Sequence, residues 1–414
     1  MLYPLTERQA RFMGLAQELA AVFSQRAAKH DHDGSFPFEN FDDIRASGLP
    51  ALVVPKEYGG WGANLLETVL TMETLAVGDG STALSLVMHM QTLGSAAEAR
   101  TWPEPLLAQI CRDAVERGAL VNALATEPEL GSPSRGGRPK TVARPVPAQD
   151  GRPSGWLLNG RKTFASLSPA LDYLVIFAAI EAGDESDEPS LDLGNGNFVV
   201  TPGKGVEIVE TWDAMGMRAT GSHDVLLKDV FVPGSHFIPP AAKGSEKGAG
   251  PRINAWFPLT VSAVYVGVAV AALQAAARFA HERIPTALGK PIAELESIQR
   301  RLGQAELLIH QARTHLYHTA DLWDRCPTRR DDLAESIIVA KFTATNNAIA
   351  AVDHCMRVVG GASMSRSLPL ERYYRDVRGG LSHPMNDDQA LVLLGRQALA
   401  RNPSPSEQKS GEQE

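Results

Sequence analysis

The spacing of apolar residues along the first third of the chain predicts helices. Between residues 6 and 117, apolar side chains recur every three or four positions, as at Phe12, Leu15, Leu19 and Phe23. This spacing places them on one face of a helix, which then packs against a core. Short breaks fall at turns that carry glycine or proline. The first third therefore reads as a set of packed helices.

The pattern changes between about residues 119 and 239. Here short β-branched and aromatic runs, such as YLVIFAAI and VLLKDVFVP, are each bounded by Gly, Pro, Asp or Asn. Such runs indicate strands. From about Ile253 to Leu399, helical spacing returns over long segments rich in Ala and Leu. We therefore expect an α+β chain: an N-terminal helical domain (1–118), a middle β-barrel domain (119–240), a C-terminal four-helix bundle (241–401) and a disordered tail (402–414).

Composition and charge exclude several classes of protein. The 414 residues carry a formal net charge of -8 and no block of Lys and Arg, which argues against nucleic acid as a partner. The longest apolar stretch, 258–273, is interrupted by Thr260 and Ser262 and is shorter than the roughly 20 residues of a membrane span. We interpret it as a buried helix. Three scattered cysteines and the absence of a secretory apolar run at the start favour a cytoplasmic protein.

Two motifs in the first half of the chain point to a known family. VPKEYGGWG (54–62) is a Gly-Gly turn between helices, and ATEPELGS (125–132) opens the β-domain. Together with the helix, sheet, helix order, they resemble the acyl-CoA dehydrogenase superfamily from about residue 5 to about residue 395. The resemblance implies a bound flavin that is contacted by Thr126, Gly131 and Ser132. The alternative for Thr126 is a turn in which its hydroxyl caps a strand.

The resemblance extends to the strands that follow. KTFAS places Phe164 where the family has a tryptophan against the flavin ring, and Ser166 where it has a hydroxyl at flavin N5. A hydroxyl there can donate to oxidised N5 or accept from reduced N5–H. The segment MGMRATGS matches a strand pair of the family, in which Arg218 and Ser222 either face substrate or hold the hairpin. We favour the structural alternative for both.

The C-terminal bundle carries the remaining cofactor motifs. By resemblance, Arg283 and Gln299 contact the flavin pyrophosphate of a neighbouring subunit, which implies a homotetramer or homodimer. Gly360 and Gly361 let backbone approach the adenylate half of FAD. Arg357 replaces the usual glutamine, and a guanidinium suits phosphate. The expected cofactor is therefore FAD, with FMN as the alternative.

The family's catalytic carboxylate is missing from both of its usual positions. Removal of an α-proton from an acyl thioester needs a positioned base, but Pro384 and Phe257 occupy the two matching positions. His383 stands beside the first. RDVRGGLSHP resembles the flavin monooxygenases of this fold, including the dibenzothiophene monooxygenase, in which a histidine lies near the flavin. His89 and Ser166 match further polar residues of that branch, although His89 lies in an apolar helix and is equally well explained as a core histidine.

Three functions remain open from the sequence. The favoured one is a reduced-flavin monooxygenase of a small organic substrate, with His383, His89 and Ser166 as catalytic residues and a flavin reductase or electron-transfer protein as a partner. The alternative is an acyl-CoA dehydrogenase in which His383, or a carboxylate elsewhere in the chain, serves as a non-standard base. Asp387 or Asp388 could be such a displaced base, although we favour both as caps of the last helix. The third is a flavin-binding subunit without activity, which the retained polar residues disfavour.

Overall fold

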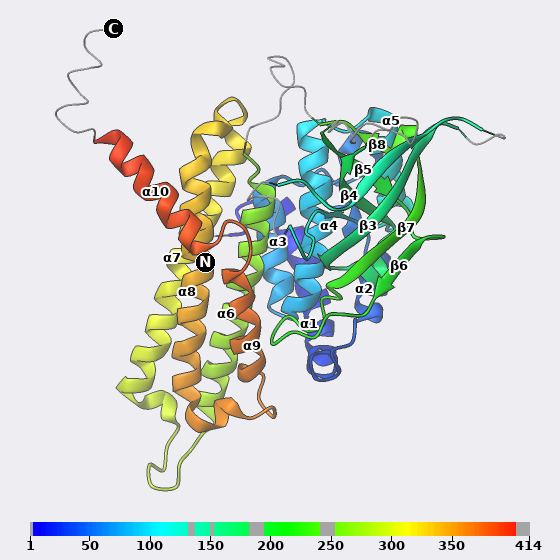
Figure 1. Ribbon diagram of the computed structural model, residues 1–414. Coiled ribbons are helices and arrows are strands. Elements are labelled where there is room, and N and C mark those ends of the chain that lie inside the picture. Colours follow the sequence, from blue (N-terminus) through cyan, green and yellow to red (C-terminus); the bar gives the residue numbers. More distant parts are fainter. Residues whose placement is uncertain (1–2, 131–136, 150–152, 182–193, 241–252, 403–414) are drawn as a thin grey trace, which may run out of the picture.

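The computed structural model describes residues 3–130, 137–149, 153–181, 194–240 and 253–402, and confirms the order of helices, sheet and helices (Figure 1). The predicted flavin contacts Gly131 and Ser132 and nearly all of the predicted tail lie outside these ranges. The N-terminal part is helical, as its apolar spacing predicts. Its helices are α1 (Glu7–Asp33), α2 (Phe38–Ala46), α3 (Leu65–Ala76), α4 (Gly80–Ala99) and α5 (Glu104–Glu116).

Local sequence signals set the ends of these helices. Asn64 caps α3 by accepting a hydrogen bond from Glu67 N–H, and the Glu67 carboxylate accepts in return from Asn64 N–H. The Gly-Gly turn before it is as tight as its sequence suggests. A Cβ at Gly60 would lie 2.2 Å from the Val54 carbonyl oxygen. Only glycine therefore fits at that point of the VPKEYGGWG motif.

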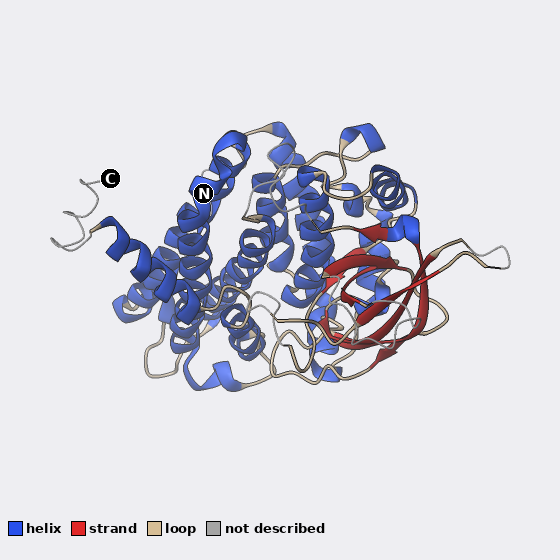
Figure 2. Ribbon diagram, turned by 45° about the horizontal axis from the view of Figure 1, so that its top comes forward, coloured by secondary structure: helices blue, strands red, loops and turns tan. Residues whose placement is uncertain are grey.

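The middle part is one strongly curved sheet that wraps toward a barrel (Figure 2). Its strand order is β6-β7-β3-β2-β4-β5-β8, and β1 pairs with β4 off this path. The pairs β1–β4 and β2–β4 are parallel, and the others are antiparallel. The strands are β1 (Val121–Leu124), β2 (Val142–Val146), β3 (Gly155–Ala165), β4 (Tyr173–Ile180), β5 (Asn195–Val200), β6 (Val206–Val209), β7 (His223–Pro233) and β8 (Phe237–Ile238).

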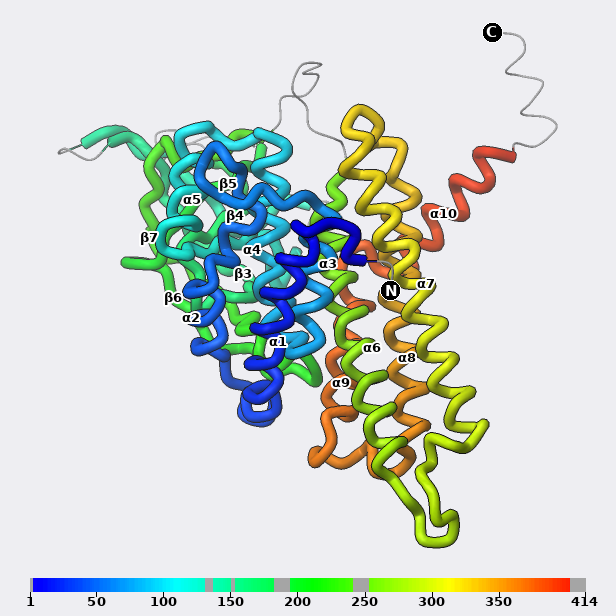
Figure 3. The backbone as a smooth tube through the Cα atoms, turned by 180° about the vertical axis from the view of Figure 1, so that it is seen from behind, coloured from blue at the N-terminus to red at the C-terminus, as the bar shows by residue number. Residues whose placement is uncertain are grey.

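The C-terminal part is built on three long helices that pack side by side, as Figures 1 and 3 show. The short helix α9 and the 3-10 turn after it (Val377–Leu381) pack on α6 and α8 and complete the bundle. Helix α10 contacts α8 and then projects away from the body (Figure 1). The helices are α6 (Trp256–Glu282), α7 (Glu296–Arg325), α8 (Ala334–Val359), α9 (Leu370–Asp376) and α10 (Asp387–Arg401).

Helix α6 joins the two helical parts. It packs against α3 and α4 on one side and against α7 and α8 on the other. The approach to α3 is close, because a Cβ at Gly267 would lie 2.4 Å from the Glu73 carbonyl oxygen. By length and composition α6 could cross a membrane, but most of its apolar stretch is buried in the protein. It is the buried core helix that the sequence predicts.

Candidate functional site

The sheet brings three of the predicted flavin-contacting residues together. The backbone N–H of Thr163 donates to Thr126 O at 3.0 Å, so the loop after β1 lies against the end of β3, next to Phe164 and Ser166. Phe164 has a left-handed φ of 54° and its side chain is 61% exposed. An exposed ring held at a strand end by an unfavourable backbone conformation needs a reason. A planar aromatic cofactor lying on it would supply one.

A buried ion pair lies next to the group formed by Thr126, Phe164 and Ser166, which we call the platform. Lys162 Nζ lies 2.6 Å from Glu127 Oε1, and both side chains are fully buried. Glu127 also accepts from the backbone N–H groups of Lys140 and Thr141. Burial alone would raise the pKa of Glu127, but its hydrogen bonds from Lys162 and Thr141 hold that pKa below the ordinary value. Glu127, the first of the two acidic residues of the ATEPELGS motif, is therefore structural, which the sequence did not reveal.

Ser166 belongs to a chain of hydroxyl groups. Its Oγ lies 2.7 Å from Ser222 Oγ, which lies 2.7 Å from Thr220 Oγ1. The side-chain nitrogen of Asn122 donates to the Ser166 carbonyl at 2.9 Å. The other end of that amide, Asn122 Oδ1, is buried and accepts no hydrogen bond from the described part of the chain. Ser222 thus forms a hydrogen bond with Ser166 of the platform. This role differs from both roles expected from the sequence, which were contact with substrate and support of the hairpin.

The segment Met215–Arg218 links the sheet to the bundle. Met217 N–H donates to Asp376 Oδ1 at 2.5 Å, and Arg375 Nη1 donates to Met215 O at 2.9 Å. A Cβ on Gly216 would lie 2.5 Å from the Arg375 backbone. Arg218 donates to Asp31 O and Ala214 O. The structure therefore supports the structural alternative for Arg218, which holds the hairpin.

The two positions of the missing carboxylate converge on His383. The Phe257 ring lies edge-on to the His383 ring, with centroids 5.9 Å apart and planes at 71°. Tyr265 Oη lies 2.7 Å from His383 Nε2. The paired glycines before His383 allow this contact, because a Cβ on Gly379 would lie 2.8 Å from Tyr265 Oη. The place that the resemblance assigns to a base therefore holds an imidazole, a phenol and a phenyl ring.

The surroundings keep this group of side chains uncharged. Burial and the nearby positive charge of Lys341 lower the pKa of His383 to about 4. Burial also raises the pKa of Tyr265, so the phenol keeps its proton. His383 is then neutral at physiological pH. Since Tyr265 engages Nε2, the other ring nitrogen, Nδ1, is left without a partner among the described residues. That nitrogen can exchange a proton or hydrogen bond with a ligand.

Lys341 itself was not singled out from the sequence. It extends from α8, its side chain is 4% exposed, and its Nζ makes no hydrogen bond within the described ranges. The nearest acid is Asp387, whose Oδ1 is 3.8 Å away. Burial lowers the pKa of Lys341. Asp387 also accepts from Asn346, and the cap of α10 is Asn386 rather than either aspartate. The capping role expected for Asp387 and Asp388 was therefore wrong, and Asn386 fills it.

His89 does not face a ligand. It is fully buried in α4; its Nε2 donates to Pro50 O at 2.9 Å, and its Nδ1 accepts from Val121 N–H at 3.2 Å. Burial lowers the pKa of His89 to about 4. With both ring nitrogens bonded to backbone, the side chain has no group left for catalysis. The structure thus corrects its assignment as a catalytic residue and supports the core alternative, in which it ties α4 to β1.

The predicted pyrophosphate and adenylate contacts gather elsewhere, at the free end of the bundle. Arg283 ends α6, Gln299 lies in the first turn of α7, and Arg357 lies in the last turn of α8, all exposed. Gly360 has φ 67° and ψ -145°, a conformation restricted to glycine. A Cβ on Gly361 would meet nothing within 4 Å. This end lies away from the sheet in Figures 1 and 3.

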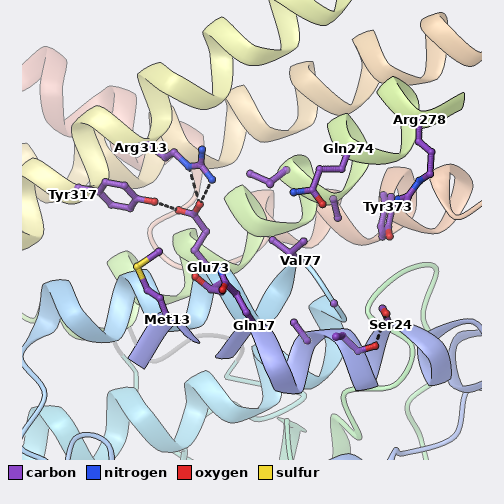
Figure 4. Close-up of a pocket in the computed structure, with 16 residues that line it drawn as sticks. Met13, Gln17, Ser24, Glu73, Val77, Gln274, Arg278, Arg313, Tyr317 and Tyr373 are labelled. Carbon is purple, nitrogen blue, oxygen red and sulfur yellow. Dashed lines mark hydrogen bonds and ion pairs between the residues drawn. The ribbon is translucent and has the colours of Figure 1, made fainter. Parts of the chain in front are cut away.

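A separate cavity of about 400 Å³ lies between α1, α3, α6 and α7. Figure 4 shows Arg313 and Tyr317 turned toward the carboxylate of Glu73, with Arg278 further along the cavity. Arg313 Nη2 lies 2.6 Å from Glu73 Oε1, and Tyr317 Oη donates to Oε2 at 2.5 Å. Its described lining includes none of the predicted site residues. The polar groups at this end satisfy one another, as in a structural ion pair.

Comparison with known proteins covers almost the whole chain. Models of the acyl-CoA dehydrogenase N-terminal, middle and C-terminal domains match residues 6–107, 122–230 and 259–388. A putative acyl-CoA dehydrogenase of Bacillus subtilis (strain 168), YdbM, is 39% identical over 96% of this chain and 99% of that protein. The amino sugar nitrososynthase RubN8 of Streptomyces rubradiris is 30% identical over 90% of this chain and 86% of that protein.

Solved structures also match over nearly the whole chain. KijD3, in complex with FMN and dTDP-3-amino-2,3,6-trideoxy-4-keto-3-methyl-D-glucose, matches with a TM-score of 0.81 and 29% identity over 96% of each chain. The dibenzothiophene monooxygenase TdsC from Paenibacillus sp. A11-2 matches with a TM-score of 0.79 over 94% of this chain and 97% of that chain; at 24% identity it shows the fold alone. With its three-part architecture, its motifs and these relatives, the chain belongs to the acyl-CoA dehydrogenase family of flavin-dependent oxidoreductases.

Proposed function

We propose that this protein is a flavin-dependent monooxygenase that uses reduced flavin to oxygenate a small organic substrate. The observation that carries the proposal is the group around His383. Pro384 and Phe257 occupy the two places of the base, His383 lies beside the first, and the side chains that contact His383 are a phenol and a phenyl ring. An acyl thioester loses its α-proton only to a base. Imidazole is itself a base, but with a pKa lowered to about 4 His383 is a weak one, and it is better suited to holding one proton near a reacting oxygen.

The reaction is balanced by reduced flavin and O2. Reduced flavin supplies two electrons and activates O2, so that one oxygen atom goes to the substrate and the other leaves as water with two protons. In this site His383 Nδ1 holds or moves a proton, and Tyr265 fixes the ring by its hydrogen bond to Nε2. The rings of Phe257 and Tyr265 pack against the imidazole.

The cofactor is FAD, with FMN as the alternative. Thr126, Phe164 and Ser166 would lie along the flavin ring. Gly131 and Ser132 lie outside the described residues, and we propose the same contact for them. The residues Arg283, Gln299, Arg357, Gly360 and Gly361 would contact the phosphates and adenylate of FAD. Because they lie at the far end of the bundle from the sheet, we propose that they serve the flavin of a second copy in a homodimer or homotetramer. A separate flavin reductase would supply the reduced cofactor.

The name of one relative suggests the substrate. RubN8 is an amino sugar nitrososynthase, and KijD3 was solved with an amino sugar nucleotide. An amine nitrogen has the lone pair that accepts an oxygen atom. We therefore propose an amine as the first substrate class to test, with sulfur heterocycles as the second.

A second function is favoured by one observation. Burial raises the pKa of Asp376 to about 7, a value that suits a base at neutral pH. In the acyl-CoA dehydrogenase alternative, this carboxylate would remove the proton. It already accepts a hydrogen bond from Met217 N–H, however, and it belongs to the contact between hairpin and bundle. We therefore rank this alternative second.

One pair of measurements separates the two functions. In the first measurement, the purified protein is mixed with short and long acyl-CoA under anaerobic conditions. In the second, it is mixed with chemically reduced FMN or FAD and a panel of amines and thiophenes, and 18O2 is then added. We expect 18O in a product and no bleaching of bound flavin by acyl-CoA. Bleaching without oxygen incorporation would establish the dehydrogenase instead. His383→Ala should lose the oxygenation and keep flavin binding, whereas the exposed control His281→Gln should behave as wild type.

A further inference from the structure

The hydroxyl chain that begins at Ser166 ends on a group that can only accept. Thr220 Oγ1 lies 3.0 Å from the Met217 carbonyl oxygen. From there the chain runs through Ser222 Oγ to Ser166 Oγ, with both steps at 2.7 Å. Thr220 is fully buried and Ser222 nearly so. The chain is therefore shielded from water along its inner part.

The direction of these hydrogen bonds follows from counting protons. Each hydroxyl has one hydrogen, and a carbonyl has none. If Thr220 donates to Met217 O, then Ser222 must donate to Thr220, and Ser166 must donate to Ser222. The reverse direction would leave two oxygen lone pairs facing each other 3.0 Å apart at Met217. The favoured direction thus uses the only hydrogen of Ser166 inside the chain and leaves its Oγ with lone pairs alone.

A second acceptor lies beside Ser166. Asn122 donates its side-chain N–H to Ser166 O, which fixes the orientation of the amide. Its Oδ1 is then an acceptor, and it is buried without a partner in the described part of the chain. Asn122 is 2% exposed. Ser166 Oγ, whose hydrogen is used within the chain, and Asn122 Oδ1 can therefore each accept a further hydrogen bond but not donate one.

We propose that Ser222 and Thr220 are positioning residues that fix Ser166 as an acceptor, so that the site binds reduced flavin more tightly than oxidised flavin. This rests on the flavin site of the proposed function. N5 of reduced flavin carries a hydrogen and can donate, whereas N5 of oxidised flavin can only accept. An Oγ that has no hydrogen to offer selects between them. A protein that receives its flavin already reduced would gain from that selection.

The test compares the affinity of the full-length protein for oxidised and reduced FMN and FAD under anaerobic conditions. We expect the wild type to bind the reduced form more tightly. Ser222→Ala removes the acceptor that occupies the Ser166 hydrogen, so Ser166 can donate to oxidised N5. The ratio of the dissociation constant for oxidised flavin to that for reduced flavin should fall about 10-fold. This fall lowers the two-electron midpoint potential of the bound flavin by about 30 mV.

Two further variants test the direction of the chain. Thr220→Ser keeps every hydroxyl and should leave the ratio unchanged. Thr220→Val removes the acceptor for Ser222 and should lower the ratio in the same direction as Ser222→Ala. Thermal melts show whether each variant is folded. An unchanged ratio in folded Ser222→Ala overturns this proposal, even where 18O incorporation supports the monooxygenase. Failure of the wild type to bind either flavin overturns both.

Discussion

The phenol oxygen of Tyr265 lies 2.7 Å from Nε2 of His383, although 118 residues separate the two in the chain. One comes from the middle of α6 and the other from the loop before α10. The contact fixes the plane of the imidazole and determines which ring nitrogen is free. The chemistry proposed for His383 therefore depends on a residue in the core helix of the bundle.

Tyr265→Phe should lower kcat for oxygenation by about 10- to 100-fold, because the imidazole loses the hydrogen bond that orients it. KM and flavin affinity should change little, since Tyr265 is not expected to contact the substrate or the flavin. Tyr317→Phe is a matched control, as it removes another buried phenol that bonds to Glu73. Steady-state kinetics measure kcat and KM of both variants. Equal losses of kcat in the two variants would show that Tyr265 acts through stability alone.

Lys341→Met should raise the pKa of His383 above its value of about 4, because it removes the positive charge that disfavours the imidazolium, whereas burial, the larger cause of the lowered pKa, remains. If the neutral imidazole is the active form, the acid limb of the pH–rate profile moves to higher pH by the same amount. Lys341→Arg keeps the charge and should leave the limb in place. An NMR titration of the histidine rings reports the same shift without activity. A limb that stays where it is in Lys341→Met would remove Lys341 from the proton chemistry.

The fold, and the proximity of three residues that we propose to contact the flavin, could be predicted because their signals are local. Apolar spacing separates helix from strand over windows of a dozen residues. Gly60 and Gly379 mark close approaches, because a Cβ there would lie 2.2 Å from Val54 O and 2.8 Å from Tyr265 Oη. Thr126, Phe164 and Ser166 lie within short motifs whose order along β1 and β3 determines where they meet.

What could not be predicted depends on partners far away in the chain. His89 forms its hydrogen bonds with residues 39 and 32 positions away, so its helix alone does not show that both nitrogens are used. Tyr265 reads as one more core residue of an apolar helix. A phenol or an amine on the buried face of a helix, as at Tyr265 and Lys341, indicates that a polar partner lies nearby. Without the packing, that signal does not identify a partner.

His89 should make the protein sensitive to acid. Its pKa is about 4 in the folded state and about 6.5 in the unfolded state. Between these values the unfolded chain binds the proton more tightly, so stability that is present above pH 6.5 is lost as the pH falls toward 4. The full effect is roughly 3 kcal/mol. In His89→Gln, urea denaturation at pH 7 and pH 4.5 should show a smaller difference between the two pH values than in wild type. The exposed His281→Gln should not; an equal slope in all three proteins would contradict the account.

The junction of α6 and α3 should tolerate no added methyl group. A Cβ at Gly267 would lie 2.4 Å from Glu73 O and 2.7 Å from Ala76 Cβ, so Gly267→Ala must push two helices apart. We expect a loss of about 1–3 kcal/mol in the free energy of unfolding. Gly303 in α7 offers the matched control, because a Cβ there meets nothing within 4 Å. Gly303→Ala should instead stabilise the protein by about 0.5–1 kcal/mol, since alanine favours the helix. Urea denaturation measures the change in the free energy of unfolding of both variants, which should be negative for Gly267→Ala and positive for Gly303→Ala. If Gly267→Ala were as stable as Gly303→Ala, α6 would not be the tightly packed link between the two helical parts.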